Sequence, residues 1–589
     1  MRNITMNAAR FLLGGALLAA LSAAAQMPSV PGEPALAPRA AESQPRLRIP
    51  PGGAPKVILS PITDAEIARV RAANRSMQKR VVIGVVRKLG EGEPLPSARD
   101  LSWTAVPGGF AAQVAVQSPS AGAMRISIDL STAPEAVEMV FFGSDDPGRL
   151  LGPVRVGTIA DRGAPWWSPL TDGDTQTVEF FAPGALDPRA MSIGIAGASH
   201  AFTTIASRFQ RKTVQDIGKA ESCNVDIKCS PLQGSGAFLN VRNSVAEMDF
   251  IDAVAGFEGL CTGQLLNDTD LTTQIPWFYS ANHCFENDSP PYKTAAQMQT
   301  VASTLNTLWF FEAVSCGSLE VPPFSQLIDG ATYLYNNQGA DSLFLRLNDT
   351  PPAGAFFAGW DANAISVGAS IVVIHHPQGD LKKVSQGSVV AYSIPQLTGG
   401  GGPTTPYTEV KYDSGSTDEG SSGSGLFTFT GTQYLLRGTL FGGGAFCTQF
   451  TESDWYSQFD KVYPSLAGYL SPIDYTDLWF NPNESGWGLN IVQHPSRNIF
   501  AVWFTYDAGG SPRWYVIPGG TWHATTNSLT AAMYQTTGPA GSAATFDPSL
   551  VKVAPVGNVT ITFSDANHGT FAYSVNGVLG SKAITRQPF

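Results

Sequence analysis

The spacing of apolar residues changes several times along the chain and divides it into segments. Between about residues 103 and 202, apolar and polar positions alternate in short runs separated by Gly, Pro, Ser and Asp. Examples of these runs are Ala112-Val114-Val116, Met124-Ile126-Ile128 and Val137-Met139-Phe141. A period of two that is broken at short intervals predicts an antiparallel β-sandwich.

The same alternation returns near the end of the chain, after Tyr475. Predicted strands at 559–563 and 571–575 flank a turn at 564–569, and Asn576-Gly577 is a further turn signal. Five tryptophans are also concentrated in this part of the chain: Trp479, Trp487, Trp503, Trp514 and Trp522. We expect residues 473–589 to form a small, separate, Trp-rich β accessory domain.

The N-terminal part has little regular patterning. A short helix is predicted at 64–70, and the Pro-, Ala- and Gly-rich stretch at about 27–60 favours an extended, poorly packed lead-in. Ahead of it, Arg2 and Arg10 precede an apolar run at 11–21, and Ala23-Ala24-Ala25 follows. These features predict a secretory signal peptide over residues 1–25, because a membrane span needs about 18 or more consecutive apolar residues.

Composition and charge exclude several classes of protein. The chain of 589 residues is 43% hydrophobic and 14% charged, which is typical of a globular protein rather than a disordered one. Its length suggests three or four domains. The net charge of -11 predicts no nucleic-acid partner. We expect a secreted protein, extracellular or periplasmic, that is a monomer.

All six cysteines lie between Cys223 and Cys447. Export to an oxidising compartment makes disulfides the expected state of these residues. A zinc site is disfavoured because the sequence has no CxxC pair. We expect no metal and no organic cofactor.

Three motifs in the cysteine-bearing region carry side chains suited to acyl transfer. They are Ser280-Ala281-Asn282-His283-Cys284, Asp341-Ser342-Leu343-Phe344 and Gly420-Ser421-Ser422-Gly423-Ser424-Gly425. A serine hydroxyl is a weak nucleophile at neutral pH, so it needs an imidazole to accept its proton and a carboxylate to orient the imidazole. We expect Ser422 to be the nucleophile, His283 the base and Asp341 the orienting group. This order along the chain is that of chymotrypsin-like serine proteases.

The surroundings of these motifs suggest further roles. Gly420 and Gly423 permit a tight turn in which the N–H groups of Gly420 and Ser422 form an oxyanion hole. The strand predicted at 438–444 has an edge that can pair with an extended substrate. His375 and His376 end an apolar run before Pro377, and we interpret them as structural or subsite residues.

Several of these motifs together resemble bacterial lysyl endopeptidase, a chymotrypsin-fold protease made with pro- and C-terminal extensions. The resemblance covers about 250 residues and rests on Ser222-Cys223-Asn224-Val225-Asp226, Ala281-Asn282-His283-Cys284, Ala358-Gly359-Trp360-Asp361, Ile374-His375-His376-Pro377 and Gly420-Ser421-Ser422-Gly423-Ser424. It implies an all-β fold with a double six-stranded β-barrel over residues 218–472, and a propeptide over 26–217 that contains the β-sandwich. The alternative role for the β-sandwich is an accessory module that stays attached. The resemblance also implies the disulfides Cys223–Cys447, Cys229–Cys316 and Cys261–Cys284.

The resemblance also bears on the primary specificity pocket. A lysine or arginine side chain of a substrate needs a carboxylate there, because its charge loses hydration on entry. Asp418 matches an acidic position of the family's pocket, although it also fits a solvated surface pair with Glu419. The family's main lysine-binding aspartate aligns with Ser457, and Asp454 takes its place only if the loop shifts. Phe441 replaces a histidine that stacks near the family's active site, and we expect Phe441 and Gly442 to line the substrate site.

The predicted function is therefore a secreted serine endopeptidase that acts on proteins or peptides and prefers a basic residue before the cleaved bond. Self-cleavage at Lys219, or at Arg211 or Lys212, is predicted to release the propeptide. Two alternatives remain open. One is a catalytically inactive relative that binds proteins or cell-surface glycans through the Trp-rich domain. The other is an endopeptidase of the same fold that cleaves after non-basic residues.

Overall fold

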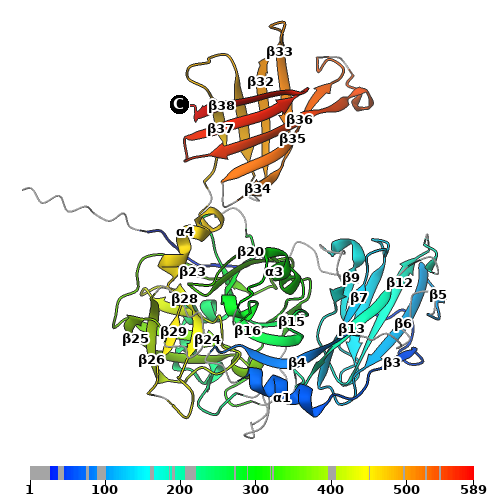
Figure 1. The fold of residues 1–589 in the computed structure, drawn as a ribbon, viewed down its shortest axis with the longest axis vertical. Coiled ribbons are helices and arrows are strands. Elements are labelled where there is room, and N and C mark those ends of the chain that lie inside the picture. Colours follow the sequence, from blue (N-terminus) through cyan, green and yellow to red (C-terminus); the bar gives the residue numbers. More distant parts are fainter. Residues whose placement is uncertain are drawn as a thin grey trace, which may run out of the picture.

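The protein consists of three β-rich parts (Figure 1). The computed structural model describes residues 27–36, 45–74, 78–88, 101–159, 165–184, 186–188, 191, 193–205, 220–270, 274–287, 290–318, 320, 324–395, 406–449, 451–471, 473–494, 498–523, 527–542 and 545–588. The predicted signal peptide at 1–25 and the predicted processing sites at Arg211, Lys212 and Lys219 lie outside these residues. Within them, no helix is long and apolar enough to cross a membrane.

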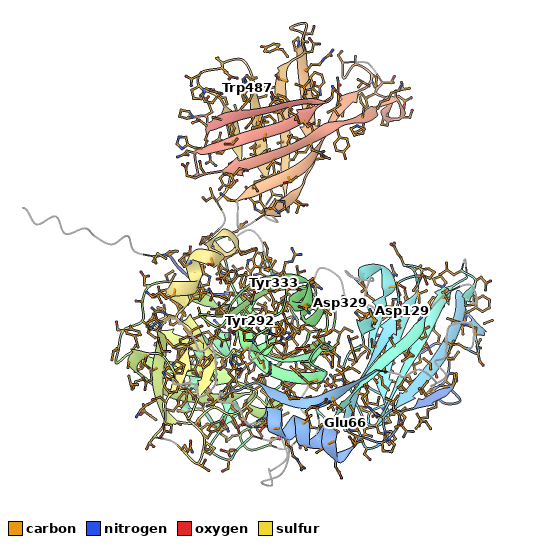
Figure 2. All side chains as sticks on the ribbon, viewed as in Figure 1. Glu66, Asp129, Tyr292, Asp329, Tyr333 and Trp487 are labelled. Atoms are coloured by element: carbon orange, nitrogen blue, oxygen red, sulfur yellow. A yellow bond between two sulfur atoms is a disulfide. The ribbon has the colours of Figure 1, made fainter. Side chains whose placement is uncertain are left out.

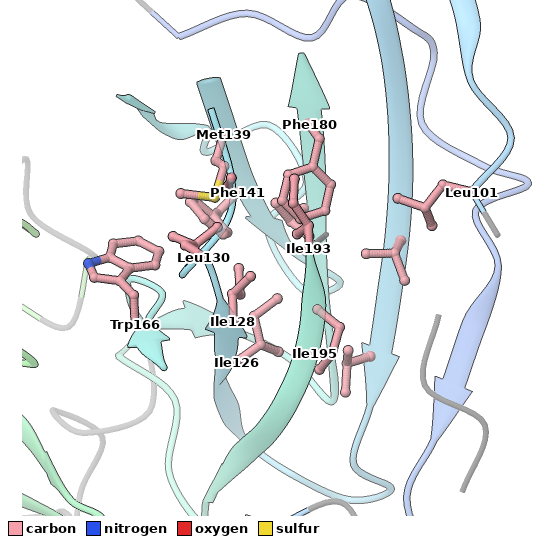
Figure 3. Close-up of a cluster of buried hydrophobic side chains, with 14 of the residues drawn as sticks. Leu101, Ile126, Ile128, Leu130, Met139, Phe141, Trp166, Phe180, Ile193 and Ile195 are labelled. Carbon is pink, nitrogen blue, oxygen red and sulfur yellow. The ribbon is translucent and has the colours of Figure 1, made fainter. Parts of the chain in front are cut away.

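The N-terminal part is the predicted β-sandwich. One sheet contains β10 (Trp166–Trp167), β11 (Thr171–Asp172), β7 (Ala123–Asp129), β13 (Gly194–Ala201) and β4 (Val81–Lys88). The other contains β3 (Lys56–Ile58), β5 (Thr104–Val106), β6 (Gly109–Gln117), β12 (Thr175–Pro183), β8 (Glu138–Gly143) and β9 (Leu151–Arg155). Apolar side chains of both sheets meet in one core that includes Ile126, Ile128, Met139, Phe141 and Phe180 (Figure 3). The alternating runs in the sequence are therefore confirmed as inward-facing strand positions.

The predicted short helix is α1, Asp64–Ala73. Thr63 is its N-cap: the Thr63 hydroxyl accepts from the Glu66 N–H, and the Glu66 carboxylate accepts from the Thr63 N–H. The Thr63 N–H and hydroxyl both donate to the Glu66 carboxylate, which lowers the pKa of Glu66. Glu66 lies on α1 beside the junction of the sandwich and the central part (Figure 2), where Val70 packs against Val82 and Val85 of β4.

The central part contains two six-stranded barrels. The first is built from β18 (Asn306–Trp309), β15 (Val245–Asp252), β16 (Phe257–Leu266), β17 (Trp277–Ser280), β21 (Ser342–Leu347) and β20 (Ala331–Asn337), with α3 (Ala295–Ala302) against it and β19 (Ser325–Leu327) beside β18. The second is built from β28 (Tyr434–Gly443), β27 (Gly425–Phe429), β24 (Ser370–His375), β25 (Lys383–Ser393), β26 (Tyr407–Ser414) and β29 (Asp454–Tyr456). Pairing of β28 with β29 closes this second ring, so the expected double barrel is confirmed.

Two helices and a shared aromatic core complete the central part. The helices are α2 (Gly236–Arg242) and α4 (Phe459–Leu470). The ring of Trp360 packs at a tilt against those of Phe459 and Tyr463 of α4, and Trp360 is fully buried. This cluster also includes residues of both barrels, which fixes how they pack together.

The lead-in is packed, contrary to the prediction for its described residues. β1 (Ser29–Val30) pairs with β23 (Gly359–Asp361), and β2 (Glu33–Pro34) pairs with β22 (Phe356–Phe357). Both partners belong to the central part, and Val30 is buried in its core. Proline-rich composition predicted an extended backbone correctly, but an extended segment can also add a strand to the edge of a sheet.

The sandwich and the first barrel share one continuous sheet. β4 pairs with β13 of the sandwich on one side and with β16 of the barrel on the other. A fully buried ion pair crosses the same junction: Arg125 Nη1 of β7 lies 3.0 Å from Asp249 Oδ1 of β15. Arg125 also donates to the carbonyl oxygens of Ser168 and Thr304. The sandwich is thus bound to the barrel by a ladder and by buried charges.

Glu258 of β16 makes this junction sensitive to pH. Its carboxylate is buried against Ser199 of β13, and burial together with the negative charge of Asp249 raises its pKa well above the ordinary value. A raised pKa in the folded state contributes stability below the ordinary glutamate pKa and loses it as pH rises through the folded-state value. We expect the wild-type melting temperature to fall relative to that of Glu258→Gln as pH rises from about 5 to about 8.

Differential scanning calorimetry of the full chain measures this effect. Glu320→Gln, which changes an exposed carboxylate, is the matched control and should run parallel to the wild type. Parallel curves for wild type and Glu258→Gln would contradict the prediction.

The C-terminal part is a third ring of antiparallel strands, apart from the others in Figure 1. It runs β30 (Asp477–Phe480), β31 (Gly488–Gln493), β32 (Ile499–Tyr506), β33 (Pro512–Ile517), β34 (Thr521–His523), β35 (Ser528–Thr537), β36 (Lys552–Phe563), β37 (His568–Val575) and β38 (Val578–Arg586). β38 returns to β30, and β33 pairs with β35. The predicted strands are β36 and β37, and Asn576-Gly577 forms the turn to β38.

Most of the clustered tryptophans serve the core of this ring. Trp479 and Trp503 are buried, and Trp487 and Trp522 pack against the same core. Trp487 lies within this domain in Figure 2. Trp514 is 57% exposed. The aromatic richness of the segment therefore reflects mainly the packing of a small β-domain.

Candidate active site

The three predicted catalytic side chains come from separate segments that meet between the barrels. His283 lies in a short 3-10 turn, Asn282–Cys284, directly after β17. Asp341 lies between β20 and β21 of the same barrel, and Ser422 precedes β27 of the other. The disulfide Cys261–Cys284 ties the turn of His283 to β16. The sequence thus brings base and acid from one barrel to the nucleophile of the second.

The geometry joins these residues in a continuous chain of hydrogen bonds. His283 Nε2 lies 2.6 Å from Ser422 Oγ, and His283 Nδ1 lies 2.8 Å from Asp341 Oδ2. The other carboxylate oxygen of Asp341 accepts from the His283 backbone N–H at 2.9 Å. Asp341 can therefore fix the imidazole with Nε2 facing the serine hydroxyl, as acyl transfer requires.

Two glycines shape the turn around Ser422. Gly420 and Gly423 have φ of 90° and 79°, a region that favours glycine. A Cβ on Gly423 would lie 2.0 Å from Ser280 Oγ and 2.4 Å from the Thr262 carbonyl oxygen. The turn therefore needs glycine for space as well as for backbone conformation.

The N–H groups of this turn converge on an oxygen from a distant part of the chain. Gly420 N and Ser422 N donate to the Lys79 carbonyl oxygen at 2.5 and 3.2 Å. These are the two donors that the sequence predicted for an oxyanion hole. A carbonyl in this position has its carbon next to the nucleophile, where a substrate carbonyl must lie.

The side chain of Lys79 enters a closed pocket beside this turn. Its ammonium group lies 2.8 and 3.0 Å from the two carboxylate oxygens of Asp454, and both side chains are fully buried. It also donates to Thr417 Oγ1 at 2.5 Å and to the Ala445 carbonyl oxygen at 2.7 Å. A buried ammonium group with a carboxylate and two further acceptors is well compensated for lost hydration.

The acid in this pocket differs from the sequence expectation. Asp454 holds the ammonium group, whereas Ser457, which aligned with the lysine-binding position, hydrogen bonds with Thr439. The Asp418 carboxylate is buried, which contradicts a solvated surface pair, and accepts from Gln378 Nε2 and the Glu419 N–H. Among the described contacts of the Lys79 ammonium, none is with Asp418. Asp454 therefore occupies the position that the resemblance gave to Ser457.

The other predicted substrate-site residues lie on β28 beside the triad. The ring of Phe441 meets that of His283 edge to face, with centroids 5.9 Å apart. Gly442 forms an antiparallel bridge with Gln78, the residue before Lys79. The edge of β28 therefore pairs with an extended segment, as the sequence predicted for a substrate.

His375 and His376 do not contact the reacting groups. His375 hydrogen bonds with Ser421 Oγ at 2.8 Å and Ser385 Oγ at 3.2 Å, and burial together with the charge of Lys79 lowers its pKa to about 3. His376 stacks on Phe311, and burial lowers its pKa as well. Both support the surrounding structure through hydrogen bonds and packing.

The three disulfides in the structure are the pairs implied by the resemblance: Cys223–Cys447, Cys229–Cys316 and Cys261–Cys284. No cysteine is free. The first closes a loop of 224 residues and attaches the start of the central part near the pocket loop. Bridges of this kind typically stabilise a fold by about 2–5 kcal/mol.

The double barrel with an adjoining Ser, His and Asp defines a protease of the chymotrypsin-like class. Comparison with known proteins agrees: the domain described as "Lysyl endopeptidase, C-terminal domain" matches residues 217–457, and "Lysyl endopeptidase N-terminal domain" matches residues 58–202. A lysyl endopeptidase of Pseudomonas aeruginosa is 34% identical over 383 residues, which cover 63% of this chain and 78% of the relative. The chain belongs to the lysyl endopeptidase family, and it is a serine endopeptidase.

Solved structures show a partial likeness to the chain. The active form of the Rv3671c protease from M. tuberculosis is 15% identical and covers 44% of this chain and 92% of its own, with a TM-score of 0.28. Deg5 is 13% identical and covers 40% of this chain and 95% of its own, with a TM-score of 0.27.

Proposed function

We propose that this chain is an exported endopeptidase that cleaves peptide bonds after lysine through an acyl-enzyme on Ser422. The observation that carries the proposal is the placement of Lys79. Its ammonium group contacts Asp454 in a closed pocket, and its carbonyl oxygen accepts from Gly420 N and Ser422 N. The side chain of Lys79 thus fills the proposed specificity pocket while its carbonyl oxygen accepts from both oxyanion donors.

The proposed reaction follows from these positions. Ser422 Oγ attacks the substrate carbonyl while His283 Nε2 accepts its proton, and Asp341 stabilises the resulting imidazolium. The two backbone N–H groups stabilise the negative oxygen of the tetrahedral intermediate, and each such donor contributes about 3–4 kcal/mol. His283 then protonates the leaving amine, and water releases the acid.

The pocket supports lysine more directly than arginine. Lysine presents a compact charge with three donors, and acceptors from three residues surround its end: Asp454, Thr417 and the Ala445 carbonyl oxygen. A guanidinium group is larger and planar and would need a wider space. Preference for a basic residue is therefore narrowed to a preference for lysine.

Export remains part of the proposal and is supported by three closed disulfides and the N-terminal sequence pattern. The rival reading as an inactive binding protein has less support, because most tryptophans of the C-terminal ring belong to its core. Pocket chemistry disfavours the other rival, an enzyme that cuts after acidic or apolar residues.

A digest of one denatured protein by the mature enzyme tests the proposal. Mass spectrometry should find peptides that end in lysine, with far fewer ending in arginine and none enriched in acidic or apolar ends. A fluorophosphonate should label the wild type and fail to label Ser422→Ala. Absence of both labelling and cleavage would overturn the proposal.

A further inference from the structure

Ser422 and His283 are buried, with 0% and 2% of their surfaces exposed, although a protease must admit substrate to both. The segment that covers them comes from the same chain, between α1 and β4. Its residues Gln78, Lys79 and Arg80 lie across the active site in the direction and register of a substrate.

The chain on both sides of Lys79 is held in place. Before it, Gln78 pairs with Gly442 on the edge of β28. After it, Arg80 Nη1 donates to the carbonyl oxygens of His283 at 2.7 Å and Glu286 at 3.2 Å, and its guanidinium group lies 4.8 Å from the ring centroid of Phe257. The bond between Lys79 and Arg80 is therefore positioned at the nucleophile.

The base of this loop is also fixed. Asn74, which follows α1, accepts from the Val82 N–H at 2.7 Å and donates to the Val82 carbonyl oxygen at 2.8 Å. Val81 then begins β4, which is paired on both sides. Residues 78–80 thus hold Lys79 at the active site with little conformational freedom to lose on binding.

We propose that Lys79–Arg80 is an internal cleavage site of this enzyme, cut in cis by its own Ser422; the inference rests on the proposed function. Ser422 Oγ bonds to the Lys79 carbonyl carbon as its proton passes to His283. The C–N bond to Arg80 then breaks, and His283 gives the proton to the Arg80 nitrogen. Water hydrolyses the ester, which leaves a Lys79 carboxylate and a free Arg80 amine.

Cleavage at this bond does not by itself free the N-terminal fragment. β1 and β2 remain paired with the central part, and β3 remains paired with β6. The Lys79 ammonium group also keeps its contacts with Asp454. The cut chain is therefore a nicked complex in which the product still occupies the specificity pocket and inhibits the enzyme.

The test follows secreted full-length chains by intact-mass spectrometry and N-terminal sequencing. Wild type should yield a fragment that begins at Arg80, and under native size-exclusion chromatography this fragment should co-elute with the fragment that ends at Lys79. Ser422→Ala should keep the bond intact, and Lys79→Met should slow its cleavage at least about 100-fold. The rate in wild type should not depend on protein concentration, because the reaction is intramolecular.

Two further variants make the result specific. Lys56→Met, which removes an exposed lysine from the same fragment, should be cut at Lys79–Arg80 like wild type. Lys79→Arg keeps a cation for Asp454, so it should fold and be cut more slowly than wild type, even if Lys79→Met is secreted poorly.

Three results would overturn the inference: an Arg80 terminus in Ser422→Ala, equal cleavage of Lys79→Arg and wild type, or an intact bond in wild type. In the last case, the activity of mature wild-type enzyme on a lysyl peptide separates the two proposals. Cleavage of that peptide leaves the proposed function standing and rejects only the internal site. Failure to cleave it rejects the proposed function.

Discussion

Alanine in place of Ser422 is expected to lower kcat of the mature enzyme on the order of 10⁶-fold, with KM changed much less. The Ser422 hydroxyl lies 2.6 Å from His283 Nε2 and is the described contact of that nitrogen. Its removal therefore leaves the base without a nucleophile to activate. Residual catalysis would come from the oxyanion donors and from substrate binding, which do not involve the hydroxyl. Steady-state kinetics on a lysyl peptide measures the effect.

The adjacent serine provides the control. Ser421 Oγ hydrogen bonds with His375 and accepts from the Asp418 N–H, away from the base. Ser421→Ala should keep fluorophosphonate labelling and lose no more than about tenfold in kcat/KM, the cost of a hydrogen bond or two. Equal losses in the two variants would show that Ser422 has no special role.

Asparagine in place of Asp454 is expected to lower kcat/KM for lysyl substrates by about 10²- to 10⁴-fold. Removing one partner of a buried charge pair typically costs about 3–5 kcal/mol, because the other charge remains without compensation. The substituted amide keeps the shape of the carboxylate, so the fold should be retained. Comparison of substrates with lysine and with its neutral isostere norleucine before the cleaved bond separates loss of charge from loss of pocket shape.

Asp418→Asn is the matched control for this substitution. Asp418 is buried in the segment between β26 and β27 that also carries Thr417, but its described hydrogen bonds go to Gln378 and to backbone N–H groups. We expect a loss of about tenfold or less in this variant, and a similar loss for lysine and norleucine substrates. A larger loss in Asp418→Asn than in Asp454→Asn would show that the assignment of the lysine contact to Asp454 is wrong.

The sequence predicted the parts of this protein that depend on local pattern. Alternation in 112–116 and 124–128 located β6 and β7, because inward-facing positions of a strand repeat every second residue. The motifs around His283, Asp341 and Ser422 could be located because each couples a reactive residue with small residues in a fixed order. Three such motifs in one order are specific even when each alone is not.

What the sequence did not predict depends on contacts between distant residues. The ion pair of Lys79 and Asp454 spans 375 positions, and neither residue lies in a motif that indicates the other as its partner. Pairing of β1 with β23 spans a similar separation and has no periodic signal in a two-residue strand. The sequence contained one signal for the segment that covers the active site: the basic pair Lys79-Arg80 ahead of a strongly apolar run.

Because the sandwich and the first barrel share a sheet, the barrel has an edge strand that is covered only while β4 is paired with it. If the sandwich departs, residues 257–260 of β16 lose their ladder to β4 and present bare amide and carbonyl groups, a template on which strands of other molecules can add. Glu258 lies on that edge strand. Once exposed to water, its carboxylate ionises, and the charge opposes pairing of the exposed strand with strands of other molecules. Because the same charge would have to be buried again, it also opposes rebinding of the sandwich.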